Sequence, residues 1–115
     1  MTLSVALQAG DRSALVAAVR PEGSGTAVLL QGEADIASRS VIVDVLTEVI
    51  ANSGGDVVVD LGGLEFIDSG SMRCLQVAGQ LLGRQGRNLN VRSPSPVATR
   101  ILELLGLSAL IGPAR

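Results

Sequence analysis

The segment that decides the fold is VVVDLGGLEFIDSGSM, residues 57–72. It opens with three consecutive valines, and an unbroken β-branched run predicts a strand that is covered on both faces, as in the middle of a sheet. The strand ends near Asp68, and a helical pattern follows in which Met72, Leu75 and Leu82 share one side. The segment therefore predicts a buried strand that leads directly into an amphipathic helix.

Asp68 and Ser69 stand where this strand gives way to the helix. Asp and Ser are preferred at helix N-caps because their side-chain oxygens accept backbone N–H groups that have no partner in the helix. The same place suits a regulatory phosphate, since a helix N-terminus presents free N–H groups and a partial positive charge. A phosphoryl group on Ser69 would add a charge of about −1.5 to −2 and repel a partner without unfolding the helix. The capping role and the switching role are compatible.

Two apolar runs and a helical pattern precede the segment. Residues 13–23 and 25–35 predict strands that pair antiparallel across the turn PEGSG. Residues 39–51 predict a helix that ANSGG ends, with a glycine closing it. The buried stripe of that helix is expected to hold Ile42, Val45, Leu46, Val49 and Ile50.

A strand, a third helix and an apolar tail are expected after the second helix. Residues 88–94 predict the strand, and Ser95 and Pro96 suit the N-cap and the first position of the helix. The tail from residue 107 is expected to pack back on the domain. The buried stripe of this helix is predicted to be Val97, Ile101, Leu104 and Leu105, with Gly106 as the C-terminal cap.

The order of elements is β, β, α, β, α, β, α, which predicts an α/β fold. Right-handed crossovers would place the strands in one mixed sheet of four to five strands, with the helices packed mainly on one face. Residues 13–115 are expected to form this single domain. The N-terminal segment 1–12 contains LSVAL, which predicts either an edge strand or a mobile segment.

The composition excludes several functions. The chain has 115 residues, a net charge of −2, no histidine, one cysteine and one aromatic residue. Histidine-based catalysis, multi-cysteine zinc sites and base-stacking surfaces are therefore absent, and no basic footprint for nucleic acid is present. Neither a signal peptide nor an apolar run of roughly 20 residues is seen, so we expect a cytoplasmic protein without direct membrane insertion and without a cofactor.

Three other groups of residues could carry chemistry. Glu33 and Asp35 could supply acid–base groups or, together with Asp68, a magnesium site, but a solvated turn that starts the next segment is the favoured explanation. Cys74 has no neighbouring base to activate it and is expected to be a small packing residue. The glycine pairs 54–55 and 62–63 do not form a phosphate-binding loop. An enzyme is thus the least favoured class of function.

Three segments resemble the STAS domains, and among these the anti-sigma-factor antagonists. LLQGEADIAS is similar to the G-E-x-D stretch of that family, and VVVDLGGLEFIDSGSM resembles its D-L-x-x-L-x-F-[IM]-D-S-[ST]-G-[LVM] motif. SPSPVATRILELLGLSALI resembles its C-terminal S-P-x-V-x-R segment. Together they span most of residues 13–111 in the order and spacing of the family.

The resemblance implies a non-enzymatic regulator of transcription that is switched by phosphorylation. Its partner would be an anti-sigma factor that is also an ATP-dependent serine kinase, and a serine phosphatase would reset it. Ser69 matches the phosphoacceptor of the family, Asp68 matches the acid beside it, and Asp35 matches the acid of the nearby strand-end loop. The predicted partner-binding residues are Glu33, Asp35, Asp68, Ser69, Gly70, Ser71, Met72 and Arg73.

The chain departs from the family motif immediately after the acceptor. The family usually has Ser or Thr and then Gly, whereas this chain has Gly70 and then Ser71. Ser71 is therefore a second candidate acceptor. A small residue after the acceptor is also similar to STAS subunits of lipid-transport systems, which bind a transporter ATPase without this switch. An interaction subunit of that kind, or of a signalling scaffold, is the alternative function.

Overall fold

The computed structural model describes residues 3–5 and 15–111. Within these residues the strands are β1 Leu3–Val5, β2 Leu15–Glu22, β3 Gly25–Ala34, β4 Val57–Ile67 and β5 Leu89–Arg92. The helices are α1 Arg39–Asn52, α2 Ser69–Gly83 and α3 Pro96–Leu104, followed by the 3₁₀ turn η1 Ser108–Leu110. The predicted order of strands and helices is confirmed. Residues 3–5 form the edge strand that was one of the two expectations for the N-terminal segment, and most of that segment lies outside the described residues.

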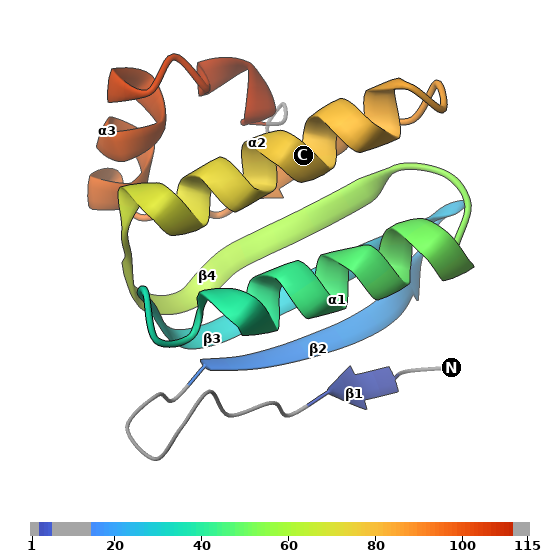
Figure 1. The fold of residues 1–115 in the computed structure, drawn as a ribbon, viewed down its shortest axis with the longest axis horizontal. Coiled ribbons are helices and arrows are strands. Elements are labelled where there is room, and N and C mark those ends of the chain that lie inside the picture. The colour runs from blue at the N-terminus through green and yellow to red at the C-terminus, as the bar shows by residue number, and fades with distance from the viewer. Residues whose placement is uncertain (1–2, 6–14, 112–115) are drawn as a thin grey trace.

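The strands form one sheet in the order β1-β2-β3-β4-β5 (Figure 1). β1, β2 and β3 pair antiparallel, and β2 meets β3 across a tight turn at Gly23 and Ser24. β3, β4 and β5 pair parallel, so the crossovers through α1 and α2 return the chain to the same end of the sheet. The mixed sheet predicted from the sequence is confirmed.

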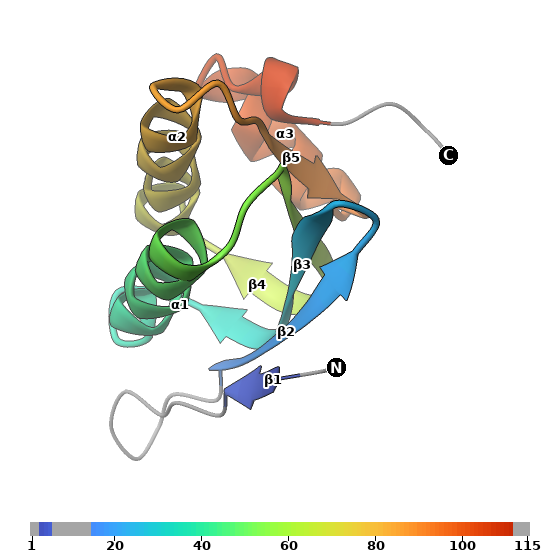
Figure 2. The ribbon, with the colours of Figure 1, turned by 90° about the vertical axis from the view of Figure 1, so that its right-hand side faces the viewer.

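The helices α1 and α2 cover one face of the sheet (Figure 2). α3 lies beside α2 and begins after the last strand, and residue Ile111 returns to pair with Val91. The tail is thus packed on the domain as far as residue 111. No helix in the described part of the chain is long and apolar enough to cross a membrane.

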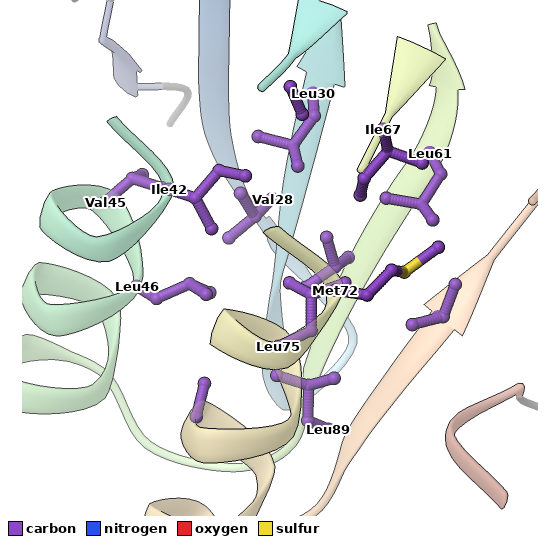
Figure 3. Close-up of a cluster of buried hydrophobic side chains, with 14 of the residues drawn as sticks. Val28, Leu30, Ile42, Val45, Leu46, Leu61, Ile67, Met72, Leu75 and Leu89 are labelled. Atoms are coloured by element: carbon purple, nitrogen blue, oxygen red, sulfur yellow. The ribbon is translucent and has the colours of Figure 1, made fainter. Parts of the chain in front are cut away.

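The core lies between the sheet and the two covering helices (Figure 3). Four of the five residues predicted for the stripe of α1 are buried, and Ile50 is half-buried against them. Apolar side chains at i, i+3 and i+4 of a helix share a face, and burying each large one contributes about 1.5–3 kcal/mol. Figure 3 shows residues from both helices and three strands meeting here, among them Ile42, Leu46, Val28, Leu61 and Leu75.

Two predictions about strands and helix ends are wrong. β4 is central, but only one face of it is covered: Val57 and Val59 are buried while Val58 and Asp60 are half-buried on the opposite face. On that face Arg92 forms ion pairs with Asp60 at 3.1 Å and Glu22 at 2.6 Å. α1 is closed by the extended residue Ser53, not by a glycine.

The predicted stripe of α3 is right only in part. Ile101 and Leu105 are half-buried against the core, but the buried residues of the helix are Ala98 and Leu102. Val97 and Leu104, which were predicted to be buried, are 68% and 72% exposed. The helix ends themselves agree with the prediction. Ser95 accepts the N–H of Ala98 at 3.0 Å, and Gly106 follows the helix with φ 72°.

Candidate functional site

The candidate site lies at the edge of the sheet where β3 and β4 end and where α1 and α2 begin (Figure 1). The two strand ends are joined directly, because the N–H of Asp68 donates to the carbonyl of Ala34 at 3.0 Å. Parallel strands bring their carboxyl ends to one edge, and ligand sites of open α/β sheets lie there. Residues 33–39 and 68–73 are therefore neighbours although about 30 positions separate them in the chain.

Asp68 is the N-cap of α2. Its backbone is extended, with φ −92° and ψ 171°, and its Oδ1 accepts the N–H of Ser71 at 2.8 Å. The capping role expected for this position thus belongs to Asp68 and not to Ser69. Ser69 is the first residue of the helix and its side chain is exposed.

Arg39 is the residue of this site that sequence reasoning missed. It is the first residue of α1, and its Nη2 donates to Oδ2 of Asp68 at 3.0 Å. Its guanidinium lies against Gly70, where a Cβ would overlap Nη2 and Cζ. The pair spans 29 positions, so no local pattern reveals it. The only signal in the sequence is an arginine at a helix start close to a predicted strand end.

The departure from the family motif at Gly70 and Ser71 now has a structural explanation. Position 70 carries no side chain because the guanidinium of Arg39 occupies that space. Ser71 is fully buried, and its Oγ has no hydrogen-bond partner among the described residues. A side chain at position 70 would collide with Arg39, whereas the hydroxyl of Ser71 is hidden under the helix.

The loop before α1 is held by Ser38, which is fully buried. Its Oγ donates to the carbonyl of Glu33 at 2.8 Å and accepts the N–H of Asp35 at 3.0 Å. Asp35 Oδ1 in turn accepts the N–H of Ala37 at 3.0 Å. These bonds form an Asx-type turn, which supports the interpretation of Asp35 as a turn residue. The side chain of Glu33 is exposed.

The residues predicted to bind a partner are not all at the surface. Glu33, Ser69 and Arg73 are exposed, and Asp35, Asp68 and Gly70 are half-buried. Ser71 and Met72 have no exposed area, because both point from α2 into the core, and the proposed surface leaves them out. Among residues 3–5 and 15–111, no three acids gather to hold a metal ion.

The charges at the site favour ionised Asp68. Burial alone would raise the pKa of this carboxyl, but hydrogen bonding from Ser71 and the positive charge of Arg39 outweigh it and lower the pKa below its ordinary value. For the Cys74 thiol the balance is opposite: burial dominates, and the pKa is raised even though Arg39 opposes the effect. Cys74 therefore stays protonated at neutral pH, and it packs against the core as expected.

We expect Asp68→Ala to lower the free energy of unfolding by about 1–2 kcal/mol at pH 7, since it removes the N-cap and leaves Arg39 without its partner. Asp68→Asn keeps an oxygen for the cap and should lose less, about 0.5–1 kcal/mol. A lowered folded pKa contributes stability above the unfolded value of about 3.9, and this is lost as the pH falls through the folded pKa. Urea denaturation should therefore show the gap between wild type and Asp68→Asn narrowing as the pH falls below about 5 and through the folded pKa. A gap that stays constant below the ordinary pKa of an aspartate would contradict the role of the charge.

The comparisons with known proteins agree with the fold and with the motif. A family model described as "Mlab, STAS domain" matches residues 17–112. The anti-sigma-F factor antagonist RsfB of Mycobacterium tuberculosis is 29% identical over 85 residues, which cover 73% of this chain and 69% of the relative.

Solved structures of anti-sigma factor antagonists share the architecture. One from Mycobacterium paratuberculosis superposes with a TM-score of 0.78 at 23% identity, over 88% of this chain and 86% of that one. SpoIIAA in its unphosphorylated form gives 0.73 at 16% identity, over 86% and 88% of the two chains. The superpositions show that the fold is shared, and at these low identities they show the fold alone. With the family model covering most of its length, the chain belongs to the STAS domain family, in which it is similar to the anti-sigma-factor antagonists.

Proposed function

We propose that this chain is an anti-sigma-factor antagonist whose binding to its partner is switched by phosphorylation of Ser69. The observation that carries the proposal is the position of Ser69: it is the exposed first residue of α2, directly beside the N-cap Asp68. The partner is an anti-sigma factor with serine kinase activity, and the antagonist binds it in the unphosphorylated form. Binding then releases the sigma factor, and transcription follows. We place this cycle in the cytoplasm.

The site suits an acceptor that does not disturb the fold. The N–H groups of Ser69 and Gly70 donate no hydrogen bond within the described residues, because the first helical bond is from Met72 to Asp68. A phosphate on Ser69 would meet these donors and the positive end of the helix dipole. Ser71, the second candidate, is fully buried, and a kinase would have to unfold the first turn of α2 to reach it. The site therefore favours Ser69.

A surface for the partner continues from Ser69 along the two helices. A groove of about 340 Å³ runs between α1 and α2, and Gly70 and Arg73 line its end near the acceptor. Val43, Val77 and Leu81 line the rest and are each about half exposed. Apolar side chains with a charged end are typical of an interface core with a polar rim. A phosphate at that end would place about two negative charges where the partner must approach.

The test uses purified chain and a panel of candidate anti-sigma-factor kinases with ATP. The kinase is expected to transfer the γ-phosphoryl group of ATP to Ser69 Oγ and release ADP. Intact-mass and peptide mapping should find one phosphate on wild type and on Ser71→Ala, and none on Ser69→Ala. A phosphate on Ser71, with Ser69 unmodified, would refute the assignment. Removal of the phosphate by a serine phosphatase should restore binding.

Binding to the same kinase is the second measurement. Ser69→Ala should bind like the unphosphorylated wild type, while Ser69→Asp should bind at least about tenfold more weakly, which is ~1.4 kcal/mol. Equal affinities for the two variants would remove the switch. Because aspartate carries less charge than a phosphate, enzymatically phosphorylated wild type should bind more weakly than Ser69→Asp.

An interaction subunit of a lipid-transport system or signalling scaffold is the second candidate. Gly70 favours it, because the small residue after the acceptor matches such subunits better than the usual hydroxyl does. In that case the partner is a transporter ATPase or a scaffold protein, and Ser69 stays unmodified in cells. Phosphopeptide mapping of chain isolated from cells, together with identification of the co-purifying ATPase, separates the two functions.

A further inference from the structure

We propose that Arg39 is the residue of this chain that binds the phosphoryl group on Ser69, and that it leaves Asp68 to do so. The inference rests on the proposed function, because it requires a phosphate at Ser69. Arg39 would thus pair with Asp68 when Ser69 is unmodified and with the phosphate when Ser69 is phosphorylated.

The position of Arg39 brackets the acceptor. Its Nη2 is 3.0 Å from Oδ2 of Asp68, the residue before Ser69. The same guanidinium lies where a Cβ of Gly70, the residue after Ser69, would be. Contact with both neighbours places the guanidinium along the first turn of α2. Replacing the glycine would push it away, so the missing side chain at position 70 leaves room for this cation at the start of α2.

Arg39 has hydrogen-bonding capacity to spare. A guanidinium carries five N–H donors in a planar fork, and the contact with Asp68 uses one of its nitrogens. Its Nε is buried and has no partner within the described part of the chain. Guanidinium groups bind phosphate through two parallel hydrogen bonds, which are stronger than bonds between neutral groups. A phosphate within reach would therefore offer this side chain more bonds than Asp68 does.

The charges favour the transfer of Arg39 from Asp68 to the phosphate. A phosphoserine carries about −1.5 to −2 at neutral pH, against −1 for Asp68, so the attraction for the same cation is larger. Asp68 does not lose its structural task when Arg39 leaves. Its Oδ1 holds the N–H of Ser71, while only Oδ2 contacts Arg39, so the cap and the ion pair use different oxygens. The helix start would thus survive the exchange.

Arg73 is the other cation near the acceptor, four positions further along α2. Its Nη1 donates to Gln76 Oε1 at 3.0 Å, so its side chain points toward the C-terminal part of the helix. Arg39 instead approaches from α1 and reaches the residues on both sides of Ser69. Phosphorylation would therefore draw the start of α1 against the start of α2. The partner would then meet a phosphate–arginine pair where it previously met Arg39 and Asp68.

The test installs phosphoserine at position 69 during synthesis of the chain, so that no kinase is needed. Phosphorus-31 NMR then measures the second pKa of the phosphate, which is about 6 in an unperturbed phosphoserine. A paired guanidinium lowers this pKa because it favours the dianion. Arg39→Gln should raise it by about 0.5 relative to the otherwise identical wild type, and the matched variant Arg73→Gln should raise it by less. Asp68→Asn should lower it further, since it frees Arg39 and removes a like charge.

Each outcome decides the inference. No change in Arg39→Gln, or a rise in Arg73→Gln that equals or exceeds it, would overturn the assignment. Circular dichroism checks that each variant is folded. The phosphate pKa of Asp68→Asn gives a second test of the inference in a variant that keeps Arg39. If the pKa depends on Arg39 but no kinase modifies Ser69, the proposed function fails and the inference stands. If a kinase modifies Ser69 but the pKa of the phosphate does not depend on Arg39, only the inference fails.

Discussion

Replacing Met72 with alanine is expected to lower the free energy of unfolding by about 2–5 kcal/mol. Met72 lies within the motif that forms the candidate site, yet its side chain is fully buried, and Figure 3 shows it pointing from α2 into the core between helix and sheet. Truncation would remove three heavy atoms from a cluster that includes Leu61, Ile67 and Leu75, and leave a cavity that these neighbours fill only in part. Urea denaturation followed by circular dichroism measures the loss.

The neighbouring residue supplies the control. Arg73 is exposed, so Arg73→Ala should change the free energy of unfolding by no more than about 0.5 kcal/mol. Partner binding should respond in the opposite order: the folded fraction of Met72→Ala binds as wild type, whereas Arg73→Ala, at the end of the apolar groove, binds more weakly. A loss of stability under 1 kcal/mol for Met72→Ala would contradict the buried position of this side chain.

The prediction of Met72 as a partner-binding residue failed for a reason that applies to the whole motif. A family motif marks residues that recur together, but it does not separate those that touch a partner from those that support the helix start. Ser69 and Ser71 illustrate the point, since both are hydroxyls two positions apart in one helical turn. One is exposed and the other fully buried, because residues separated by about 200° lie on opposite sides of a helix.

Local chemistry predicted the helices well where one pattern sufficed. The stripe of α1 has a clear partner, since the sheet covers that face and only that face. The caps Asp68 and Ser95 and the glycine after α3 follow from backbone groups that need partners at helix ends. These features depend on residues within a few positions of each other, and such dependence is visible in a single sequence.

Features that depend on distant residues were missed or wrong. The stripe predicted for α3 contained Val97 and Leu104, but the fold leaves these two residues exposed and buries Ala98 and Leu102 instead. In β4, three valines suggested two covered faces, but the helices cover one, and an ion-pair network with Arg92 occupies the other. Arg39 begins α1 and Gly70 lies in the first turn of α2, and the guanidinium fills the space that a side chain at position 70 would need. The role of either residue is therefore not visible from its own part of the sequence.

Replacing Gly25 with alanine is expected to cost about 3 kcal/mol, in the upper range for overpacking. A Cβ at this position would overlap the backbone carbonyl of Asp56, which accepts the N–H of Thr26 at 3.0 Å. Both groups are main chain at the starts of β3 and β4, so neither can rotate away as the tip of a side chain could. The two strands would have to separate where their parallel pairing begins.

The loss should leave partner binding intact, because Gly25 lies at the end of the sheet opposite the candidate site (Figure 1). Gly54→Ala is the matched control: this glycine is exposed, no atom lies within 4 Å of its added Cβ, and the change should stay within about 0.5 kcal/mol of wild type. Thermal and urea denaturation of the two variants measure the difference in stability. Similar stability for both would mean that the two strand starts can separate at little cost, whereas weaker binding by folded Gly25→Ala would mean that the sheet transmits strain from this turn to Ser69.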